Sequence, residues 1–331
     1  MLESVTDGLR LARYPASPVP RLLLVANPSS SQFTGGGHRS VVRILRRRFD
    51  VETAWPQSTD HARALTAQAV ADGFEVVAAM GGDGVVHHAG HVLAGTGTAL
   101  GVIPTGTTNV YARLFGIPSK PVAAARLLIG PHVRRPTSVL AIDGNQDRGE
   151  VRRHALFAAG FGFDAAVVRA AEEEPYRKYH FGALHYARTA IGTLLKDYRT
   201  RRPHIRVTAG ANATDAVALL VQFHPVYTYF GKKGLRLSAE PPDPMVALVV
   251  EALPARRLLR IVSSLIGSGD LDQLPGMHVW TGVDSITLEA DPPVWGQADG
   301  ELTGAWNSAA ISLRRDVLHV LAPPPSERQI R

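Results

Sequence analysis

Residues 74–93 read FEVVAAMGGDGVVHHAGHVL, and this stretch contains a strand, a loop and a helix in succession. Phe74–Met80 is almost continuously apolar, which is typical of a strand buried on both faces of a parallel sheet. Gly81-Gly82-Asp83-Gly84 follows, and three glycines in four residues let the main chain approach a ligand closely or adopt positive φ angles. Val85–Leu93 then predicts a helix. The stretch therefore predicts one strand–helix unit of an α/β sheet.

The residues on both sides repeat this alternation. Further strands are expected over Arg21–Ala26, Phe49–Ala54 and Leu100–Ile103, and helices over 38–48, Asp60–Ala71 and Asn109–Leu114. Strands that alternate with helices at this spacing indicate a doubly wound parallel sheet with helices on both faces. We expect this α/β domain to cover residues 18–137.

The second half of the chain has a different pattern, with short strands separated by Gly, Pro and Asn and one helical stretch over 179–199. Strands are expected over Ser138–Ile142, His154–Gly160, His204–Ala209, Val217–Phe223, Leu235–Ala239, Val246–Ala252, His278–Gly282, Ser285–Ala290 and Ala309–Val320. Repeated short strands with turn signals predict a β-sandwich-like domain, over residues 138–323. Residues 1–17 and 324–331 are expected to be flexible ends.

Composition excludes several classes of site. The 331 residues include no cysteine, which excludes disulfides, zinc–cysteine and iron–sulfur sites and a cysteine nucleophile. No apolar run approaches the ~18 residues of a membrane span, and the N-terminus lacks a signal-peptide core, so we expect a cytoplasmic protein. The net charge of +7 favours anionic partners. Of 36 basic residues five are lysine, which leaves 36 − 5 = 31 arginines. This excess suits phosphate recognition, although GC-rich codon usage explains it better, and we expect no nucleic-acid partner.

Three expected strands end in loops of unusual composition. The loops are Asn27-Pro28-Ser29-Ser30-Ser31, Gly81-Gly82-Asp83-Gly84 and Pro104-Thr105-Gly106-Thr107-Thr108-Asn109. Carboxyl ends of parallel strands share one edge of the sheet, where ligands bind, so we expect the three loops to converge. Their N–H groups could hold phosphate, and Asp83 could hold Mg²⁺ or accept a hydroxyl proton. Taken singly, the second and third loops are better explained as ordinary capped turns, and it is their convergence that favours a phosphate site.

Two other patterns carry candidate chemistry. In Gln297-Ala298-Asp299-Gly300-Glu301 two carboxylates flank a glycine, which is either a simple hairpin turn or the position of a general base. His87 and His91 lie four apart on one helix face and could share a metal, but the zincin pattern needs glutamate where His88 stands.

The order NPSSS, GGDG, PTGTTN, GFGFD (160–164) and DGE (299–301) resembles the diacylglycerol kinase-like lipid kinases, a family that includes soluble bacterial diacylglycerol kinases and sphingosine kinases. The resemblance runs from about Arg21 to about Val320. It implies a nucleotide-binding α/β domain, a β-rich lipid-substrate domain and an active site in the cleft between them. It also implies ATP- and Mg²⁺-dependent phosphorylation of a lipid hydroxyl.

The resemblance also implies roles for particular residues. Residues of the three loops would contact ATP, namely Asn27, Pro28, Ser29, Ser30, Ser31, Gly81, Gly82, Asp83, Gly84, Gly106, Thr107 and Asn109. Asp83 would lie by the phosphates and their Mg²⁺, and Asn109 would orient the third loop. Asp164 would join a polar network at the domain junction. Glu301 would accept the proton of the lipid hydroxyl, with Asp299 beside it, and Asp243 would belong to a structural Mg²⁺ site.

The chain departs from the family pattern at several of these positions. The family usually continues GGDG with Thr and then Asn-Glu or His-Glu, whereas this chain has Val85 and His87-His88, so a hydroxyl and a carboxylate are missing. Pro56 stands where the family often has Thr after the second strand, and Asp243-Pro244-Met245-Val246 replaces Asp-Gly-x-Leu. We expect an active but divergent lipid kinase. The alternatives are a catalytically impaired nucleotide- or lipid-binding relative and a soluble-substrate kinase such as an NAD kinase.

The partners follow from this hypothesis. A lipid substrate requires contact with the membrane surface, and the pairs at 134–135, 201–202, 232–233 and 256–257 could dock on anionic lipid or form ordinary solvated faces. Tyr227, Tyr229 and Phe230 could line an acyl pocket or belong to a strand core. An open strand edge would permit a homodimer.

Overall fold

The computed structural model describes residues 19–172, 192, 202–253, 258–267 and 270–324. Three expected features fall outside this part of the chain. One is the helix expected over 179–199, of which only residue 192 is described, and that residue is helical. The other two are the expected flexible ends, over 1–17 and 325–331.

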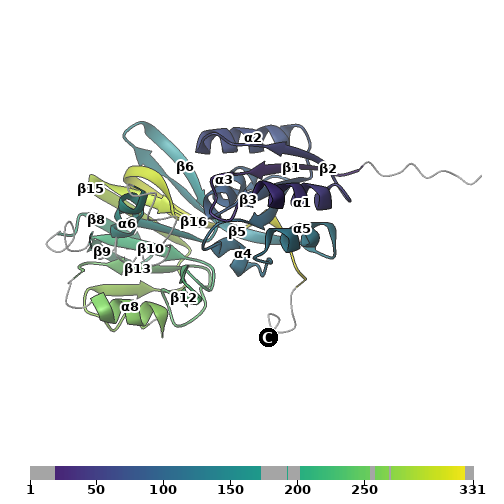
Figure 1. Cartoon of the computed structure of the whole chain (residues 1–331). Helices are drawn as coiled ribbons and strands as arrows, with labels where there is room; N and C mark the ends of the chain where they lie inside the picture. Colours follow the sequence, from purple (N-terminus) through teal and green to yellow (C-terminus); the bar gives the residue numbers. More distant parts are fainter. Residues whose placement is uncertain (1–18, 173–191, 193–201, 254–257, 268–269, 325–331) are drawn as a thin grey trace, which may run out of the picture.

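The first half is a parallel sheet covered by helices on both faces, as the sequence predicts (Figure 1). Its strands are β1 (Arg21–Ala26), β2 (Asp50–Ala54), β3 (Val76–Gly81) and β4 (Ala99–Pro104), and its helices are α1 (Gly35–Leu45), α2 (Thr59–Ala71), α3 (Asp83–Leu93), α4 (Val110–Leu114) and α5 (Pro121–Ile129). The sheet order is β4-β3-β1-β2. Helices α2 and α3 pack together on one face, and α1 and α5 on the other. Helix α5 was not expected, although Pro121 stands at its first turn, where the fixed φ of proline favours a helix start.

Local sequence explains these elements. All six residues of β3 and of β4 are buried, as their continuous apolarity requires. Helices α1 and α2 begin at the N-caps Thr34 and Ser58, whose hydroxyls accept hydrogen bonds from main-chain N–H groups of the first turn. Met80 pairs with Ala26 on one side and Ile103 on the other, so β1, β3 and β4 end level with one another.

The second half is rich in strands, which confirms the expected fold class. It contains β5 (Val133–Gln146), β6 (Gly149–Ala155), β7 (Ala158–Gly162), α6 (Phe163–Glu172), β8 (Ile205–Ala209), β9 (Asn212–Ala216), β10 (Ala218–Gln222), β11 (Thr228–Phe230), β12 (Lys233–Leu235), β13 (Val246–Val250), α8 (Leu258–Ile266), β14 (Met277–Trp280), β15 (Ser285–Ala298) and β16 (Glu301–Ala322). Strands β11 and β12 form a separate hairpin. A strand was expected over 235–239, but only Leu235 belongs to a strand, as the last residue of β12.

Strand β16 connects the two halves. It is 22 residues long, pairs antiparallel with β15 and β5, and then lies parallel to β4, with Val320 opposite Leu100. The large sheet therefore runs without interruption in the order β14-β13-β10-β7-β15-β16-β4-β3-β1-β2. Figure 1 shows the yellow β16 passing from the strand-rich half into the α/β half. The domain boundary near residue 137 stays a prediction, and that residue lies inside β5.

One expected strand is divided. The stretch His154–Gly160 was expected to be continuous, but β6 ends at Ala155 and β7 begins at Ala158. The main-chain N–H groups of Leu156 and Phe157 donate to the carboxylate of Asp299 rather than to a neighbouring strand. A distant side chain therefore makes the break.

Two apolar clusters support the sheet. One contains the buried residues of β1, β3 and β4 together with Tyr111, and the other contains Trp306 and Phe161, whose rings meet edge to face at 6.3 Å. None of the helices in the described ranges is long and apolar enough to cross a membrane.

Candidate active site

The three loops meet at the carboxyl edge of β1, β3 and β4. The Ser30 Oγ lies 2.6 Å from Thr105 Oγ1, and the Ser31 Oγ lies 3.1 Å from Thr107 Oγ1. The side chain of Gln32 donates to the carbonyl oxygen of Gly106 at 3.0 Å. These bonds connect the first and third loops across the end of the sheet, so the convergence expected from the sheet order is present.

The second and third loops touch through their main chains. A Cβ atom on Gly106 would lie 2.6 Å from the Cα of Gly82, so only glycine fits this contact. Asn109 closes the third loop: it has a left-handed φ of 49°, donates to the Gly106 carbonyl at 2.7 Å and accepts from the Gly106 N–H at 3.1 Å. Asn109 therefore fixes the shape of the third loop, and its role in a nucleotide site stays a prediction.

Helix α3 begins in this group of loops. Gly82 is its N-cap, and within the described chain no side chain caps the first turn. The uncapped N–H groups and the helix dipole make this end of α3 suitable for a phosphate group. Phosphate binding by the GGDG loop stays a prediction, and the helix start on which it depends is present.

Asp83 also has a structural contact. Its Oδ2 accepts from the Val110 N–H at 2.9 Å and its Oδ1 from the Tyr111 N–H at 3.0 Å, so the carboxylate holds the start of α4. The pKa of Asp83 is raised to about 6, mainly by burial; the two N–H donors oppose the shift, and the charges of Asp299 and Glu301 add to it. Asp83 therefore connects the GGDG loop to the helix that follows the third loop.

Asp299 lies at the tip of the β15–β16 hairpin and is fully buried. Its carboxylate accepts from the N–H groups of Leu156, Phe157 and Ala158 at 2.6–3.1 Å and lies 2.8 Å from Nδ1 of His87. Because an ionised carboxylate can only accept hydrogen bonds, Nδ1 of His87 carries the proton in this contact, and the four contacts together use all the acceptor sites of the carboxylate. Asp299 thus has no oxygen left for a substrate, and its position is that of an anchor.

The side chain of Glu301, the first residue of β16, lies beside the first turn of α3. A Cβ atom on Gly84 would lie 2.2 Å from its Oε1, so the carboxyl group occupies the space above the GGDG loop. Its Oε2 lies 3.6 Å from Nε2 of His88, and its side chain is 28% exposed. Of the predicted site residues, Glu301 is the partly accessible carboxylate that the fold brings to the loops.

In the sequence, His87 and His88 were noted as departures from the family pattern, and His87 also as a possible metal partner of His91. In the structure each imidazole faces one carboxylate of the Asp299-Gly300-Glu301 turn. Of the metal pair considered for His87 and His91, the rings stack at a centroid distance of 6.4 Å, and Nδ1 of each ring already has a protein partner, Asp299 for His87 and the His154 N–H for His91. The described residues contain no group of three metal-ligating side chains.

Asp164 joins a buried polar network between β7, β15 and the segment before β11. Its Oδ2 accepts from the Tyr227 hydroxyl at 2.7 Å and from the Gln297 side chain at 2.6 Å. Burial raises the pKa of Asp164, and the two donors oppose this shift.

The three aromatic residues considered for an acyl pocket lie in different surroundings. Tyr227 belongs to the polar network of Asp164. The centre of the Tyr229 ring lies 3.4 Å from the guanidinium carbon of Arg113, and Phe230 is exposed.

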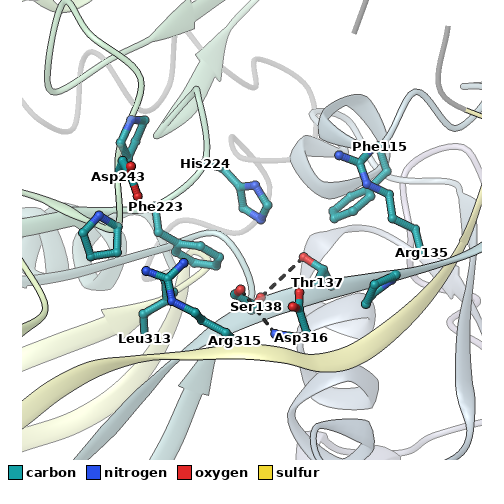
Figure 2. Close-up of a pocket in the computed structure, with 13 residues that line it drawn as sticks. Phe115, Arg135, Thr137, Ser138, Phe223, His224, Asp243, Leu313, Arg315 and Asp316 are labelled. Carbon is teal, nitrogen blue, oxygen red and sulfur yellow. Dashed lines mark hydrogen bonds between the residues drawn. The ribbon is translucent and has the colours of Figure 1, made fainter. Parts of the chain in front are cut away.

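Asp243 lies away from this group. It lines a cavity of about 230 Å³ at the junction of the two halves, together with Phe115, Arg135, Thr137, Ser138, Phe223, His224, Leu313, Arg315, Asp316 and three prolines. Figure 2 shows Asp243 beside Phe223 at one end and Arg135 with Phe115 at the other. None of the loop residues lines it. Because no cluster of three ligating side chains occurs in the described residues, Asp243 as a metal ligand stays a prediction.

Comparisons with known proteins agree with this geometry. A model of the diacylglycerol kinase catalytic domain matches residues 21–140. A diacylglycerol kinase of Mycobacterium tuberculosis is 30% identical over 312 residues, covering 92% of this chain and 96% of the relative. A Xanthomonas campestris protein named "Probable lipid kinase YegS-like" is 32% identical over 165 residues, which is 47% of this chain and 50% of that protein.

Solved structures show the same fold. The crystal structure of a diacylglycerol kinase from Bacillus anthracis superposes with a TM-score of 0.65 at 17% identity and covers 93% of this chain and 98% of that one. A yeast NADH kinase superposes with a TM-score of 0.50 at 9% identity, covering 92% of this chain and 84% of that one. With near-complete coverage by a relative that is 30% identical, the chain belongs to the diacylglycerol kinase family.

Proposed function

We propose that this protein is a lipid kinase that transfers the γ-phosphoryl group of ATP to a hydroxyl group of a diacylglycerol-like or sphingoid-like lipid, with Mg²⁺ as the metal. The observation that supports it most is the position of Glu301. Its carboxyl group lies directly above Gly84, at the end of the sheet where the three loops meet. A partly exposed carboxylate beside a phosphate-binding helix start is the arrangement that a kinase needs.

The loops have the features of a nucleotide phosphate site. The uncapped start of α3 offers N–H groups, the contact of Gly82 with Gly106 keeps the main chain free of side chains, and the hydroxyls of Ser31 and Thr107 lie on the same edge. When bound, ATP supplies the phosphoryl group and Mg²⁺ offsets the negative charge of the phosphates. Asp83 would hold the metal, and because it is one carboxylate the remaining ligands would be phosphate and water oxygens, as is usual for Mg²⁺.

Different residues of the chain have different roles in the proposed reaction. Glu301 takes the proton of the lipid hydroxyl as the hydroxyl oxygen forms its bond to the γ-phosphorus and the bond to the leaving ADP breaks. The α3 N–H groups and the loop hydroxyls stabilise charge on the transferred group. Asp299 does not react, and it holds the hairpin that carries Glu301 against α3.

The lipid acceptor resides in a bilayer, so we propose a cytoplasmic protein that associates peripherally with anionic membrane. Lys232 and Lys233 at the β11–β12 turn, and Arg134 and Arg135 in β5, are exposed basic residues suited to this contact. The pair 256–257 and residue 201 lie outside the described residues.

The test uses the full chain with γ-labelled ATP, Mg²⁺ and a total lipid extract, beside the Glu301→Gln variant. Glu289→Gln, an exposed glutamate on β15, is the matched control. A labelled lipid that is lost in E301Q and kept in E289Q supports the proposal, and its migration identifies the substrate. In a parallel assay with NAD as the acceptor, label on NAD and none on lipid would indicate a soluble-substrate kinase. An absence of any labelled product, with ATP still raising the melting temperature, would indicate a nucleotide-binding relative without catalysis.

A further inference from the structure

Helix α3 contacts both oxygens of the Glu301 carboxylate. Oε1 lies above Gly84, where an added Cβ atom would approach it to 2.2 Å, and Oε2 lies 3.6 Å from Nε2 of His88. Gly84 and His88 are four residues apart and so share one face of the helix. The oxygen nearer the GGDG loop is therefore Oε1, while Oε2 points along the helix toward the imidazole.

His88 is suited to donate to this carboxylate. Its side chain is 7% exposed, and burial lowers its pKa, with the charges of His87 and Arg63 acting in the same direction and Glu301 opposing them, so the ring is neutral. Its Nδ1 is buried and has no hydrogen-bond partner in the described residues. A buried N–H group without an acceptor is costly, so the proton belongs on Nε2, which faces Glu301.

We infer that His88 is a positioning residue for Glu301, which it holds by donating Nε2–H to Oε2 so that Oε1 faces the phosphate loops; the inference rests on the proposed function. At 3.6 Å the two atoms stand just beyond hydrogen-bond distance in the free protein. Contacts of this kind are often long in the free enzyme and tighten with substrate bound. The imidazole thus orients the carboxylate at a position where the family pattern has a glutamate.

A second histidine provides the matched control. His91 lies one turn further along α3, and its ring contacts His154 at a centroid distance of 5.0 Å. Its Nδ1 accepts from the His154 N–H. Replacing His91 removes an imidazole from the same helix without touching Glu301, and so separates a loss of helix packing from a loss of positioning.

The first arm measures lipid phosphorylation by His88→Leu, His88→Gln and His91→Leu, with rates normalised to folded protein. We expect H88L to lower kcat by about tenfold or more while the KM for ATP stays within about twofold, because positioning acts on the reacting group. H88Q should recover most of kcat, because its amide N–H can also donate. Equal losses in H88L and H91L, or an H88Q as slow as H88L, would overturn the inference.

The second arm needs no turnover. In protein labelled with ¹⁵N-histidine, the His88 ring resonances are assigned by their absence in H88Q and followed in Glu301→Gln. We expect E301Q to shift the His88 resonances and leave those of His91 in place; unchanged His88 resonances would contradict the contact. If the wild-type protein phosphorylates no lipid, the proposed function fails, and this arm decides the His88–Glu301 contact on its own.

Discussion

Nδ1 of His87 on helix α3 lies 2.8 Å from Oδ2 of Asp299 at the tip of the β15–β16 hairpin, and both side chains are buried. The contact joins the β3–α3 unit to the last hairpin of the chain. Because the hairpin also carries Glu301, the position of the candidate base relative to the GGDG loop depends on this pair.

Asp299→Asn tests the anchor. An asparagine side chain offers one acceptor oxygen and adds two N–H donors that face other donors, so buried N–H groups lose their partner. We expect the free energy of unfolding to fall by about 3–5 kcal/mol, the range for breaking a buried charged contact. Urea denaturation measures it.

The matched control is Asp215→Asn. Asp215 pairs with Arg206 at 3.1 Å, but both side chains are more than half exposed. Its substitution should cost less than about 1 kcal/mol. Similar losses for the two variants would show that Asp299 is not an anchor.

Gly84→Ala tests the placement of Glu301. The new methyl group would lie 2.2 Å from Oε1, and the flexible carboxylate, rather than the helix, would move. We expect lipid phosphorylation to fall by about tenfold or more, as for other misplaced reacting groups, with little change in melting temperature. Gly36→Ala in α1, where a Cβ atom meets nothing within 4 Å, should leave the activity unchanged. Full activity in G84A would exclude the observed carboxylate position from the reaction.

The partly buried His91 makes the protein sensitive to acid. Burial, with smaller effects of neighbouring positive groups, lowers the pKa of His91 to about 3. The unfolded chain binds a proton there at about 6.5, so it takes up more protons than the folded chain, and stability is lost as pH falls from about 6.5 toward 3. The free energy of unfolding of wild type relative to His91→Gln should therefore drop by up to roughly 1.4 kcal/mol per pH unit in this window.

This comparison with H91Q cancels other groups, including Asp83, whose raised pKa gives the opposite slope between about 4 and 6. Urea titrations from pH 7.5 to 4.5 measure the difference, with His61→Gln on α2 as the control. A difference that stays constant with pH would contradict the prediction.

Arg113→Ala tests the contact between α4 and the β11–β12 hairpin. The guanidinium lies 3.4 Å from the centre of the Tyr229 ring and donates to the carbonyl oxygens of Gly231 and Lys232 at 2.9 and 3.3 Å. Its loss should cost roughly 1–2 kcal/mol and speed amide hydrogen exchange in residues 228–235. Arg126→Ala, an exposed residue of α5, should leave that exchange unchanged.

Membrane docking is tested by the double variant Lys232→Glu and Lys233→Glu. Each basic residue near an anionic surface contributes ~1 kcal/mol, so binding to vesicles rich in anionic lipid should weaken by at least ~30-fold. The same charge change at Arg46 and Arg47, which follow α1, is the control. Cosedimentation with vesicles gives the measurement, and equal binding by both variants would contradict docking through the hairpin.

Local sequence was sufficient for most of the α/β half. Continuous apolar runs predicted β1, β3 and β4 to within about two residues, because a strand buried on both faces needs no information from elsewhere. The three loops could also be expected to meet, because parallel strands end at one edge. Helix α5 was missed, and its short Ala- and Leu-rich stretch is defined mainly by packing against α1 and β4.

The sequence by itself determined the fold class, the family motifs and the identity of Glu301 as a candidate base. Only the tertiary structure decided that β6 and β7 separate, that β16 completes the first sheet, and that His87 and His88 each face a carboxylate of the last hairpin. The physical reason is that these contacts join residues far apart in the chain. They depend on the register of β15 and β16, which shifts between Gly296 and Gln297, and no local pattern of apolar or polar residues specifies that register.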